Sequence, residues 1–475
     1  VAYGDNLRML QPFSSDKTTV LGALARIRDL PVPVRRQRVT DPAFSEHPVI
    51  VSRTQVVGSA QAIDLSGPTK LTAEDFKFTY FTRPQEDGKL ALAGIYNGYI
   101  SGIDVESPTK AIVHWEKVMP IAIDWMASLA NFILPKDYFQ EVGAEGFASA
   151  PVGSGPYKLV EYQKGSRIIL EKFADYWGPE PQFDRVVFEV TKDPSSRVAA
   201  IQSGRVDIAT SLPIREAVRL GELDGLTAEI VPMTTVMILH LRDTGDFADP
   251  RVRLAAHHAI DKNALNTALF AGHARPLSTV GVPSMPGFDD SFEFAHDPEK
   301  AKALLTEAGF GPDNPAKITF FSINGVHPND WEMSRAITAM WKNVGIEATL
   351  EPMEISTFFE LNAAAKLPAA TLWGWNGPAN DPEMFTGTLV NPDSRFSVMK
   401  SEDMRQRLAP LLGEFDKDKR IASYAEADRF AVENGLVIPI LQGVYTMVHK
   451  SGLTVPVPST GWRSMSRHST RARSM

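Results

Sequence analysis

Two short stretches gather aromatic and amide side chains, whose types suit the binding of a solute better than its chemical conversion. Trp373, Trp375 and Asn376 belong to a run that ends at Pro382 and follows a buried strand predicted at 369–372. Tryptophan rings beside glycines and amides suit a cleft, where apolar faces stack on a ligand and amides fix its polar groups. The alternative is a tryptophan that fills the core beside a turn. The paired tryptophans favour a ligand site.

The second stretch has a similar composition and also follows a strand, predicted at 318–321. It contains Asn324, His327 and Trp331, which we expect as further ligand-binding residues. Loops that follow strands in α/β proteins often carry binding residues, because a rigid scaffold positions them.

Motifs for catalysis or for metal and cofactor binding are not found in the sequence. There is no zincin pair, Walker A loop or nucleophile elbow. Gly153–Gly155 lacks the third glycine of a dinucleotide site, and Ser107–Lys110 matches Ser-x-x-Lys only across a proline turn. His257 and His258 are adjacent in a predicted helix, so they point about 100° apart and are poor joint metal ligands. We expect one of them partly buried and the other exposed. The prediction is a protein that is not an enzyme, with no catalytic residues, no metal and no cofactor.

Composition and charge limit the classes of partner. The chain has 475 residues, a net charge of -8, and no cysteine, which excludes disulfides and thiolate sites. Its pI of about 5.8 argues against nucleic acid, because phosphate binding needs clustered basic residues. The sequence has no apolar run near the ~20 residues that a membrane helix needs. A chain that begins at Val1 fits a processed mature form, and we expect a soluble protein without membrane insertion.

Helix start signals recur along the chain and indicate the elements that position these stretches. Asp-Pro pairs begin at Asp193, Asp249 and Asp297, with aspartate in the N-cap position and proline in the first helical position. Thr72 is a further predicted N-cap. Glycine closes two of these helices, at Gly204 and at position 309.

Strand signals alternate with these helices. We predict a hairpin of 157–162 and 167–171 around Gly165, a strand at 186–190, and a β-α-β run through 318–321, 333–344 and 346–350. A further strand is expected near 108–116. This order indicates a mixed α/β architecture.

The motifs of the chain resemble those of the family 5 extracellular solute-binding proteins, the peptide/nickel/opine group of ABC-importer receptors. The resemblance covers roughly residues 71–455. It is carried by Gly153–Tyr157, Asp175–Gly178, Phe183–Val186, Gln202–Ile208, Asp249–Arg253, Ala259–Lys262, Asp297–Leu305, Glu307–Gly309, Gly345–Ile346 and Ile438–Pro439. The segments before residue 71 and after residue 462 depart from the family pattern, and we expect the last one to be a loose tail.

The resemblance implies a two-lobed periplasmic-binding-protein fold of the class II, or cluster C, type with an extra subdomain. Residues 1–19, 150–238 and 440–475 would form lobe I, 20–149 its extra subdomain, and 239–439 lobe II. The ligand cleft would lie between the lobes, and binding would favour the closed form because the ligand contacts both lobes only there.

The resemblance also bears on the ligand. In dipeptide and oligopeptide receptors of this family, an aspartate four residues before the proline of an Asp/Glu-Pro pair holds the peptide ammonium. Here the pair is Asp381–Pro382 and the corresponding residue is Pro378, while Trp375 matches a pocket tryptophan. Free-amine peptides are therefore in doubt, and sugar-like solutes, opines or blocked peptides become alternatives.

The leading hypothesis is a monomeric periplasmic receptor that captures a peptide-like or other small solute and delivers it to a membrane ABC permease. The main alternative is a receptor for an oligosaccharide- or opine-type solute. A secreted hydrolase is the alternative from another class, and turnover of the solute would reveal it. A sensory role, presenting the solute to a membrane receptor, is also left open.

Overall fold

The computed structural model describes residues 6–11, 60–64, 71–88, 90, 93–116, 120–122, 126, 132–191, 193–324, 326–377, 381–394 and 396–455. The tail predicted after residue 462 and most of the segment before residue 71 lie outside these residues. The chain forms two compact units, the first comprising Val1–Thr210, His449–Pro456 and Trp462–Met475, and the second Ser211–Val448 and Val457–Gly461. The lobe boundaries expected at 238 and 439 fall inside the long strands β9 (Leu226–Leu241) and β14 (Val437–Lys450). The predicted three-part division stays a prediction.

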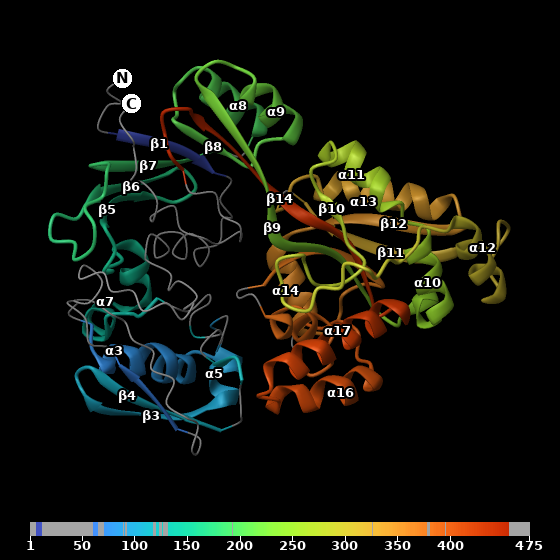
Figure 1. The fold of residues 1–475 in the computed structure, drawn as a ribbon, viewed down its shortest axis with the longest axis horizontal. Helices are drawn as coiled ribbons and strands as arrows, with labels where there is room; N and C mark the ends of the chain where they lie inside the picture. The colour runs from blue at the N-terminus through green and yellow to red at the C-terminus, as the bar shows by residue number, and fades with distance from the viewer. Residues whose placement is uncertain are drawn as a thin grey trace. The chain divides into compact units, whose positions relative to one another are not determined.

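The first unit contains, among its described residues, a sheet with the strand order β8-β1-β7-β6-β5 (Figure 1). Its strands are β1 (Asn6–Gln11), β5 (Tyr157–Gln163), β6 (Arg167–Lys172), β7 (Arg185–Val190) and β8 (Ile208–Thr210). The predicted hairpin is confirmed, since β5 and β6 pair antiparallel around Gly165, whose φ is +72°. β1 pairs in parallel with both β7 and β8.

A second sheet of the first unit has the order β2-β4-β3. It comprises β2 (Ala60–Asp64), β3 (Ile100–Ser107) and β4 (Lys110–Trp115). The helices of this unit are α3 (Ala73–Lys77), the π-helix η1 (Phe78–Thr82), α4 (Arg83–Glu86), α5 (Ala93–Tyr99), α7 (Lys136–Ser149) and α8 (Pro194–Gln202). The predicted N-cap at Thr72 is confirmed, and Asp75 accepts hydrogen bonds from the Thr72 amide and hydroxyl.

The second unit is built on a sheet with the order β12-β11-β13-β9-β14, and β10 pairs with β14. Its other strands are β10 (Arg275–Pro276), β11 (Ala316–Ile323), β12 (Ile346–Met353) and β13 (Ala370–Asn376). β11 pairs in parallel with both β12 and β13, whereas β13 pairs antiparallel with β9. The predicted β-α-β run is therefore confirmed.

The second unit contains helices that pack on its sheet or on one another. They are α9 (Ile214–Gly221), η2 (Gly245–Ala248), α10 (Pro250–His258), α11 (Lys262–Phe270), α12 (Pro298–Glu307), α13 (Asp330–Lys342), α14 (Ile355–Ala363), η3 (Pro382–Met384), α15 (Thr386–Leu389), α16 (Glu402–Leu408), η4 (Ala409–Gly413) and α17 (Lys417–Glu433). Figure 1 shows α13 and α14 on opposite sides of the strands. This alternation of strands and helices confirms the predicted mixed α/β architecture.

The predicted helix starts are confirmed in atomic detail. Asp193, Asp249 and Asp297 are N-cap residues whose carboxylates accept hydrogen bonds from the backbone amides of Ser196, Arg251 and Lys300. The following proline stands in the first turn each time. Such caps satisfy amides that have no partner within the helix.

Two local predictions are wrong. The strand expected to end at Leu372 continues through Asn376, because residues 370–376 pair with 235–241 of β9. The two tryptophans therefore stand on a strand and not in a loop. His257 and His258 are both buried, with 1% and 6% exposure, because both rings stack on Phe294.

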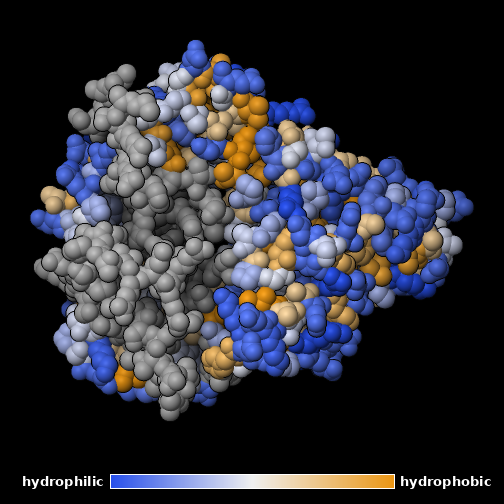
Figure 2. All heavy atoms as spheres, viewed as in Figure 1, coloured by the Kyte–Doolittle hydropathy of each residue, from blue (hydrophilic) through white to orange (hydrophobic). Residues whose placement is uncertain are grey.

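The surface over α12 and α16 is dominated by hydrophilic residues on the face shown in Figure 2. Within the described part of the chain, no helix combines the length and the apolar character that crossing a bilayer requires.

Candidate functional site

The two predicted stretches meet at one edge of the second unit's sheet. Phe320 pairs with Ala370 and Ser322 with Leu372, so β11 and β13 run side by side in parallel. The carboxyl ends of parallel strands lie at the same edge, and such edges are common ligand sites in α/β proteins. The residues that follow β11 are thus brought beside the end of β13.

His327 lies directly against the backbone of β13. A Cβ atom at Gly374 would stand 2.1 Å from His327 Nε2, so only glycine leaves room for the imidazole there. The ring also hydrogen-bonds to the Gly374 backbone. Burial lowers the pKa of His327, although the charge of Asp330 and this hydrogen bond oppose the effect. The ring is therefore a neutral hydrogen-bonding group at neutral pH.

Asp330 fixes the loop that carries His327. Its carboxylate is 2% exposed and accepts hydrogen bonds from the amides of Val326 at 2.9 Å and His327 at 3.0 Å. The Trp331 amide donates to its other oxygen at 2.8 Å. Bonds from several amides to one carboxylate are charge-assisted and hold a loop in a single conformation. The Asp330 carboxylate is thus bound by backbone amides of the protein.

The two tryptophans lie on the opposite face of the sheet from His327, because side chains alternate along a strand. The Trp373 ring, 7% exposed, stacks on Phe358 of α14 with a centroid distance of 4.1 Å and an interplanar angle of 7°. Phe359 meets the same ring edge-on and is itself 42% exposed. Trp373 thus belongs to an aromatic cluster with one exposed margin.

Trp375 is anchored by its indole nitrogen. Its Nε1 donates to the Met384 carbonyl oxygen at 2.7 Å, and its ring lies 5.0 Å from that of Phe396. The side chain is 9% exposed. Its polar atom is therefore engaged by the protein, which leaves the ring as the part that a ligand would contact.

The remaining predicted residues lie around this edge. Asn376 is half-buried on the same face as Gly374, and its Oδ1 accepts a hydrogen bond from Thr234 Oγ1 at 2.9 Å. Asn324 is exposed just beyond β11, and Trp331 is half-buried in the first turn of α13. The structure brings His327 to the end of β13, whereas the tryptophans face the other side. Pro378, on which the argument against free-amine peptides depends, lies outside the described residues.

Sequence reasoning missed the charged residues that hold the chain after β13. Asp381 and Glu383 are buried, and Arg420 of α17 lies against both. The signal available in the sequence was the four-residue spacing of Arg420, Tyr424 and Asp428, which places three polar side chains on one helix face. The partner segment lies about forty positions away, and nothing local in the sequence identifies it.

Comparison with known proteins relates this fold to binding proteins. The family described as bacterial extracellular solute-binding proteins, family 5 Middle, matches residues 66–396. A dipeptide-binding protein of Escherichia coli is 28% identical over 335 residues, which is 68% of this chain and 62% of that protein. The di/tripeptide-binding protein 2 of Pseudomonas aeruginosa is 28% identical over 322 residues, 65% of this chain and 60% of that protein. The chain thus matches less than two thirds of the length of either relative.

Solved structures share the fold over almost the whole chain. The periplasmic binding protein DppA from Helicobacter pylori, in complex with the peptide STSA, has a TM-score of 0.82 at 21% identity. The alignment covers 97% of this chain and 96% of that one. The binding protein MoaA of A. tumefaciens R10, in complex with mannopinic acid, has a TM-score of 0.78 at 21% identity, covering 97% of each chain. The periplasmic-binding-protein fold predicted from the sequence is confirmed.

Proposed function

The chain belongs to the family 5 bacterial extracellular solute-binding proteins, and we propose that it is a solute receptor of an ABC importer. The observation that carries this proposal is the family match over residues 66–396, together with the position of the His327 loop beside the end of β13. In the proposal the solute is captured by closure of two lobes and passed to a membrane permease. A periplasmic location, a monomeric state and the lack of catalysis are parts of the same proposal.

The polar groups at the described edge favour a ligand that is recognised by neutral hydrogen bonds. His327 supplies a neutral imidazole, and Asn324 and Asn376 supply amides. Asp330 is bonded to three backbone amides, and Asp381 is paired with Arg420. Neither carboxylate is offered to the ammonium group of a peptide.

This observation supports the second candidate, a receptor for a blocked peptide, an opine or a sugar-like solute. A peptide with a free amine remains the first candidate, because the Escherichia coli relative is named for binding dipeptides and the Pseudomonas aeruginosa relative for binding di- and tripeptides. The two candidates differ in one testable feature, the requirement for a charged amine on the ligand.

Calorimetry with the full chain separates the two. We would titrate it with Met-Leu, with N-acetyl-Met-Leu and with mannopinic acid, after native mass spectrometry has identified any solute that copurifies. Binding of the acetylated peptide or of mannopinic acid at least about tenfold tighter than Met-Leu supports the second candidate. Tight binding of Met-Leu that acetylation abolishes would reject it.

Variants test the site itself. His327→Ala should weaken binding of the best of these three probes by about tenfold, because a half-buried hydrogen-bonding partner of the ligand is lost. His296→Ala is the matched control, since His296 is an exposed histidine of the same unit. Equal affinities of the two variants would remove His327 from the site. Recovery of the probe chemically unchanged after long incubation argues against the hydrolase alternative.

A further inference from the structure

One face of α17 carries three buried polar residues at four-residue spacing. Arg420, Tyr424 and Asp428 are 4%, 0% and 6% exposed, although arginine and aspartate are rarely buried without partners. On a helix, residues four apart lie one above another, so the three side chains form a single polar stripe. All three contact the segment 381–388, which follows the end of β13.

Arg420 holds the start of that segment through two parallel bonds. Its Nη1 donates to Asp381 Oδ1 at 2.8 Å, and its Nη2 donates to Asp381 Oδ2 at 2.6 Å. Glu383 Oε2 lies 3.8 Å from the same guanidinium. Burial alone lowers the pKa of Arg420, but the hydrogen bonds and charges of its two acidic neighbours outweigh burial and raise it. A fork of this kind fixes orientation as well as charge.

Tyr424 and Asp428 hold the rest of the segment. A Cβ atom at Gly387 would stand 3.2 Å from the Tyr424 hydroxyl oxygen and 2.9 Å from Glu383 Cγ, so the chain passes close to the helix. Asp428 receives a hydrogen bond from the Thr386 side chain, and it also binds the amides of Val280 and Gly281. The segment is thus attached along the whole polar stripe.

The other side of the segment is attached to the candidate site. Trp375 Nε1 donates to the carbonyl oxygen of Met384, which lies between the residues held by Arg420 and by Asp428. Any shift of the segment would therefore move the acceptor that orients the Trp375 ring. The helix, the segment and the tryptophan form one continuous chain of contacts.

We infer that α17 positions the segment 381–388 and, through Met384, the Trp375 ring, and that Arg420 is the positioning residue for ligand binding. This inference rests on the proposed function, because the ring is taken to face a solute. Arg420 itself touches the segment and not the ligand.

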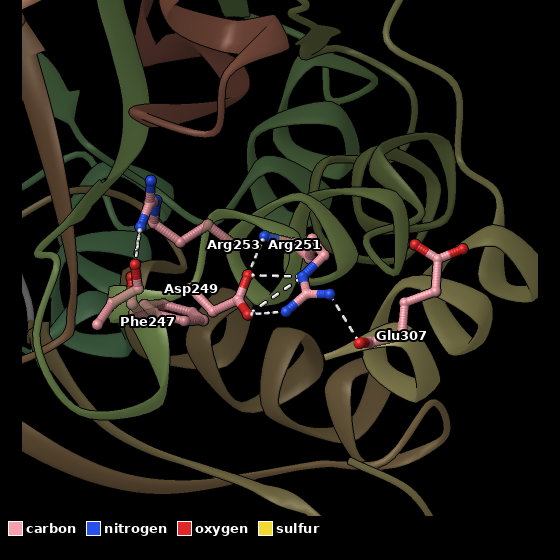
Figure 3. A network of polar contacts seen from close by, with 6 residues as sticks. Phe247, Asp249, Arg251, Arg253 and Glu307 are labelled. Atoms are coloured by element: carbon pink, nitrogen blue, oxygen red, sulfur yellow. Dashed lines mark hydrogen bonds and ion pairs between the residues drawn. The ribbon is translucent and has the colours of Figure 1, made fainter. Parts of the chain in front are cut away.

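A second buried arginine provides a matched control. Arg253 of α10 is 6% exposed in the same unit, and its guanidinium donates to the carbonyl oxygen of Gly435 at 2.8 Å. It also donates to the carbonyl oxygen of Phe247 at 2.5 Å (Figure 3). Its hydrogen-bond partners Phe247, Ala248 and Gly435 lie outside the segment 381–388. Arg253→Lys thus makes the same change of side chain at equal burial, away from the segment.

The first experiment needs no ligand. Hydrogen–deuterium exchange of full-length Arg420→Lys should show exchange in peptides covering 381–390 at least about tenfold faster than in the unsubstituted chain. Trp375 emission, isolated by subtracting the spectrum of Trp375→Phe, should shift to the red. Arg253→Lys should change neither signal. Unchanged exchange at 381–390 in Arg420→Lys would overturn the inference. Should that variant fail to fold, Asp381→Asn tests the same fork.

The second experiment adds N-acetyl-Met-Leu and mannopinic acid as probes. Arg420→Lys should weaken whichever probe binds by at least about fivefold, and Arg253→Lys should leave its affinity unchanged. Faster exchange with unchanged affinity would show a purely structural residue and overturn the positioning role. If the unsubstituted chain binds neither these probes nor Met-Leu, the proposed function fails and the ligand part of the inference fails with it. The exchange result still decides whether Arg420 holds the segment.

Discussion

Two buried arginines of the same unit reach their positions by different chemistry. Arg253 donates its hydrogen bonds to neutral carbonyl oxygens, including that of Ala248 at 3.2 Å. Burial lowers its pKa, although the charges of Asp243 and Asp249 oppose the shift. Arg420 is surrounded by carboxylates, which raise its pKa in spite of burial. The two arginines are therefore similarly buried but differ in their electrostatic surroundings. Arg253 links backbone segments through their carbonyl oxygens. Arg420 binds carboxylates, so the stability of its region depends on their charge.

Figure 3 shows the surroundings of Arg253. Asp249 caps α10 and pairs with Arg251, whose Nη1 reaches the Glu307 carbonyl oxygen at 2.7 Å. Arg251 and Arg253 are two residues apart and serve an exposed and a buried network respectively. Both regions join distant parts of the chain, Arg253 to Gly435 and Arg420 to Asp381. The Arg420 region lies near the candidate ligand edge.

Removing each arginine should give the largest effect. Arg420→Met leaves Asp381 and Glu383 buried without a cation, and we expect a loss of about 3–5 kcal/mol in the free energy of unfolding at pH 7. This loss should shrink as the pH falls, because protons neutralise the stranded carboxylates. Arg253→Met strands carbonyl oxygens, each worth about 1–3 kcal/mol, and these do not titrate. Urea unfolding at pH 4.5 and pH 7 measures both losses. If both losses in the free energy of unfolding change with pH in the same way, the two regions do not differ in their dependence on charge.

Asp428, at the other end of the polar stripe, allows a second test of how the stability of this region depends on charge. Burial raises its pKa to about 7, although the amides of Val280 and Gly281 and the Thr386 side chain oppose the shift. Between about pH 4 and pH 7 the folded chain keeps a proton that the unfolded chain has lost, so the contribution of Asp428 to stability falls as the pH rises. Asp428→Asn does not titrate. Relative to the unsubstituted chain it should gain about 3 kcal/mol between pH 4.5 and pH 8.

Urea unfolding at several pH values measures that gain. Asp416→Asn changes an exposed carboxylate of the same helix and serves as the control. If the stability difference between Asp428→Asn and the unsubstituted chain is the same at pH 4.5 and pH 8, the buried carboxyl does not carry the pH dependence.

Gly374 offers a smaller, steric test at the ligand edge. Gly374→Ala would place a Cβ atom 2.1 Å from His327 Nε2, and we expect a loss of about 1–3 kcal/mol together with displacement of the imidazole. The double variant with His327→Ala should recover most of that loss, because the colliding ring is gone. Gly413→Ala, where no atom lies within 4 Å, is the control. Thermal unfolding of the four proteins gives the coupling between the two residues, and additive losses would contradict the contact.

The helix caps should give the smallest effect and should not distinguish the regions. Asp249 caps α10 beside Arg253, and Asp416 caps α17 below Arg420. Replacement of either by alanine should cost about 1 kcal/mol, measured by chemical unfolding. If the two losses are similar, the difference between the regions comes from the arginines and not from the helix caps. A much larger loss for Asp416→Ala would mean that the start of α17 also contributes.

Local signals predicted the scaffold well. The Asp-Pro pairs mark the helix starts, and Gly165 marks the hairpin, because capping and turn formation depend on residues a few positions apart. The end of β13 was misplaced because the tryptophans beside Gly374 suggested a loop. Pairing with β9 instead extends the strand through Asn376. His257 and His258 were misjudged because the ring that buries them, Phe294, lies 36 or more positions away.

The candidate site was predictable only in composition. The sequence identifies the aromatic and amide stretches, and the parallel pairing of β11 and β13 brings them to one edge. It does not reveal that Gly374 receives the His327 ring, nor that the tryptophans face the other side. Both depend on the alternation of side chains along a strand whose end was misplaced.

The strand order of the second unit has a consequence for how that unit forms. β9 lies between β13 and β14 in the sheet, yet β14 starts at Val437, nearly two hundred positions after β9 ends at Leu241. Gln442 of β14 donates to the Met233 carbonyl oxygen, and Arg275 of β10 pairs with the same Gln442. Closing so long a loop is slow, and a growing chain that stops before Val437 leaves the edge of β9 open to other strands. The sheet of this unit can therefore be completed only after its final strand has been synthesised. Chains shortened before Val437 should aggregate through the exposed edge of β9.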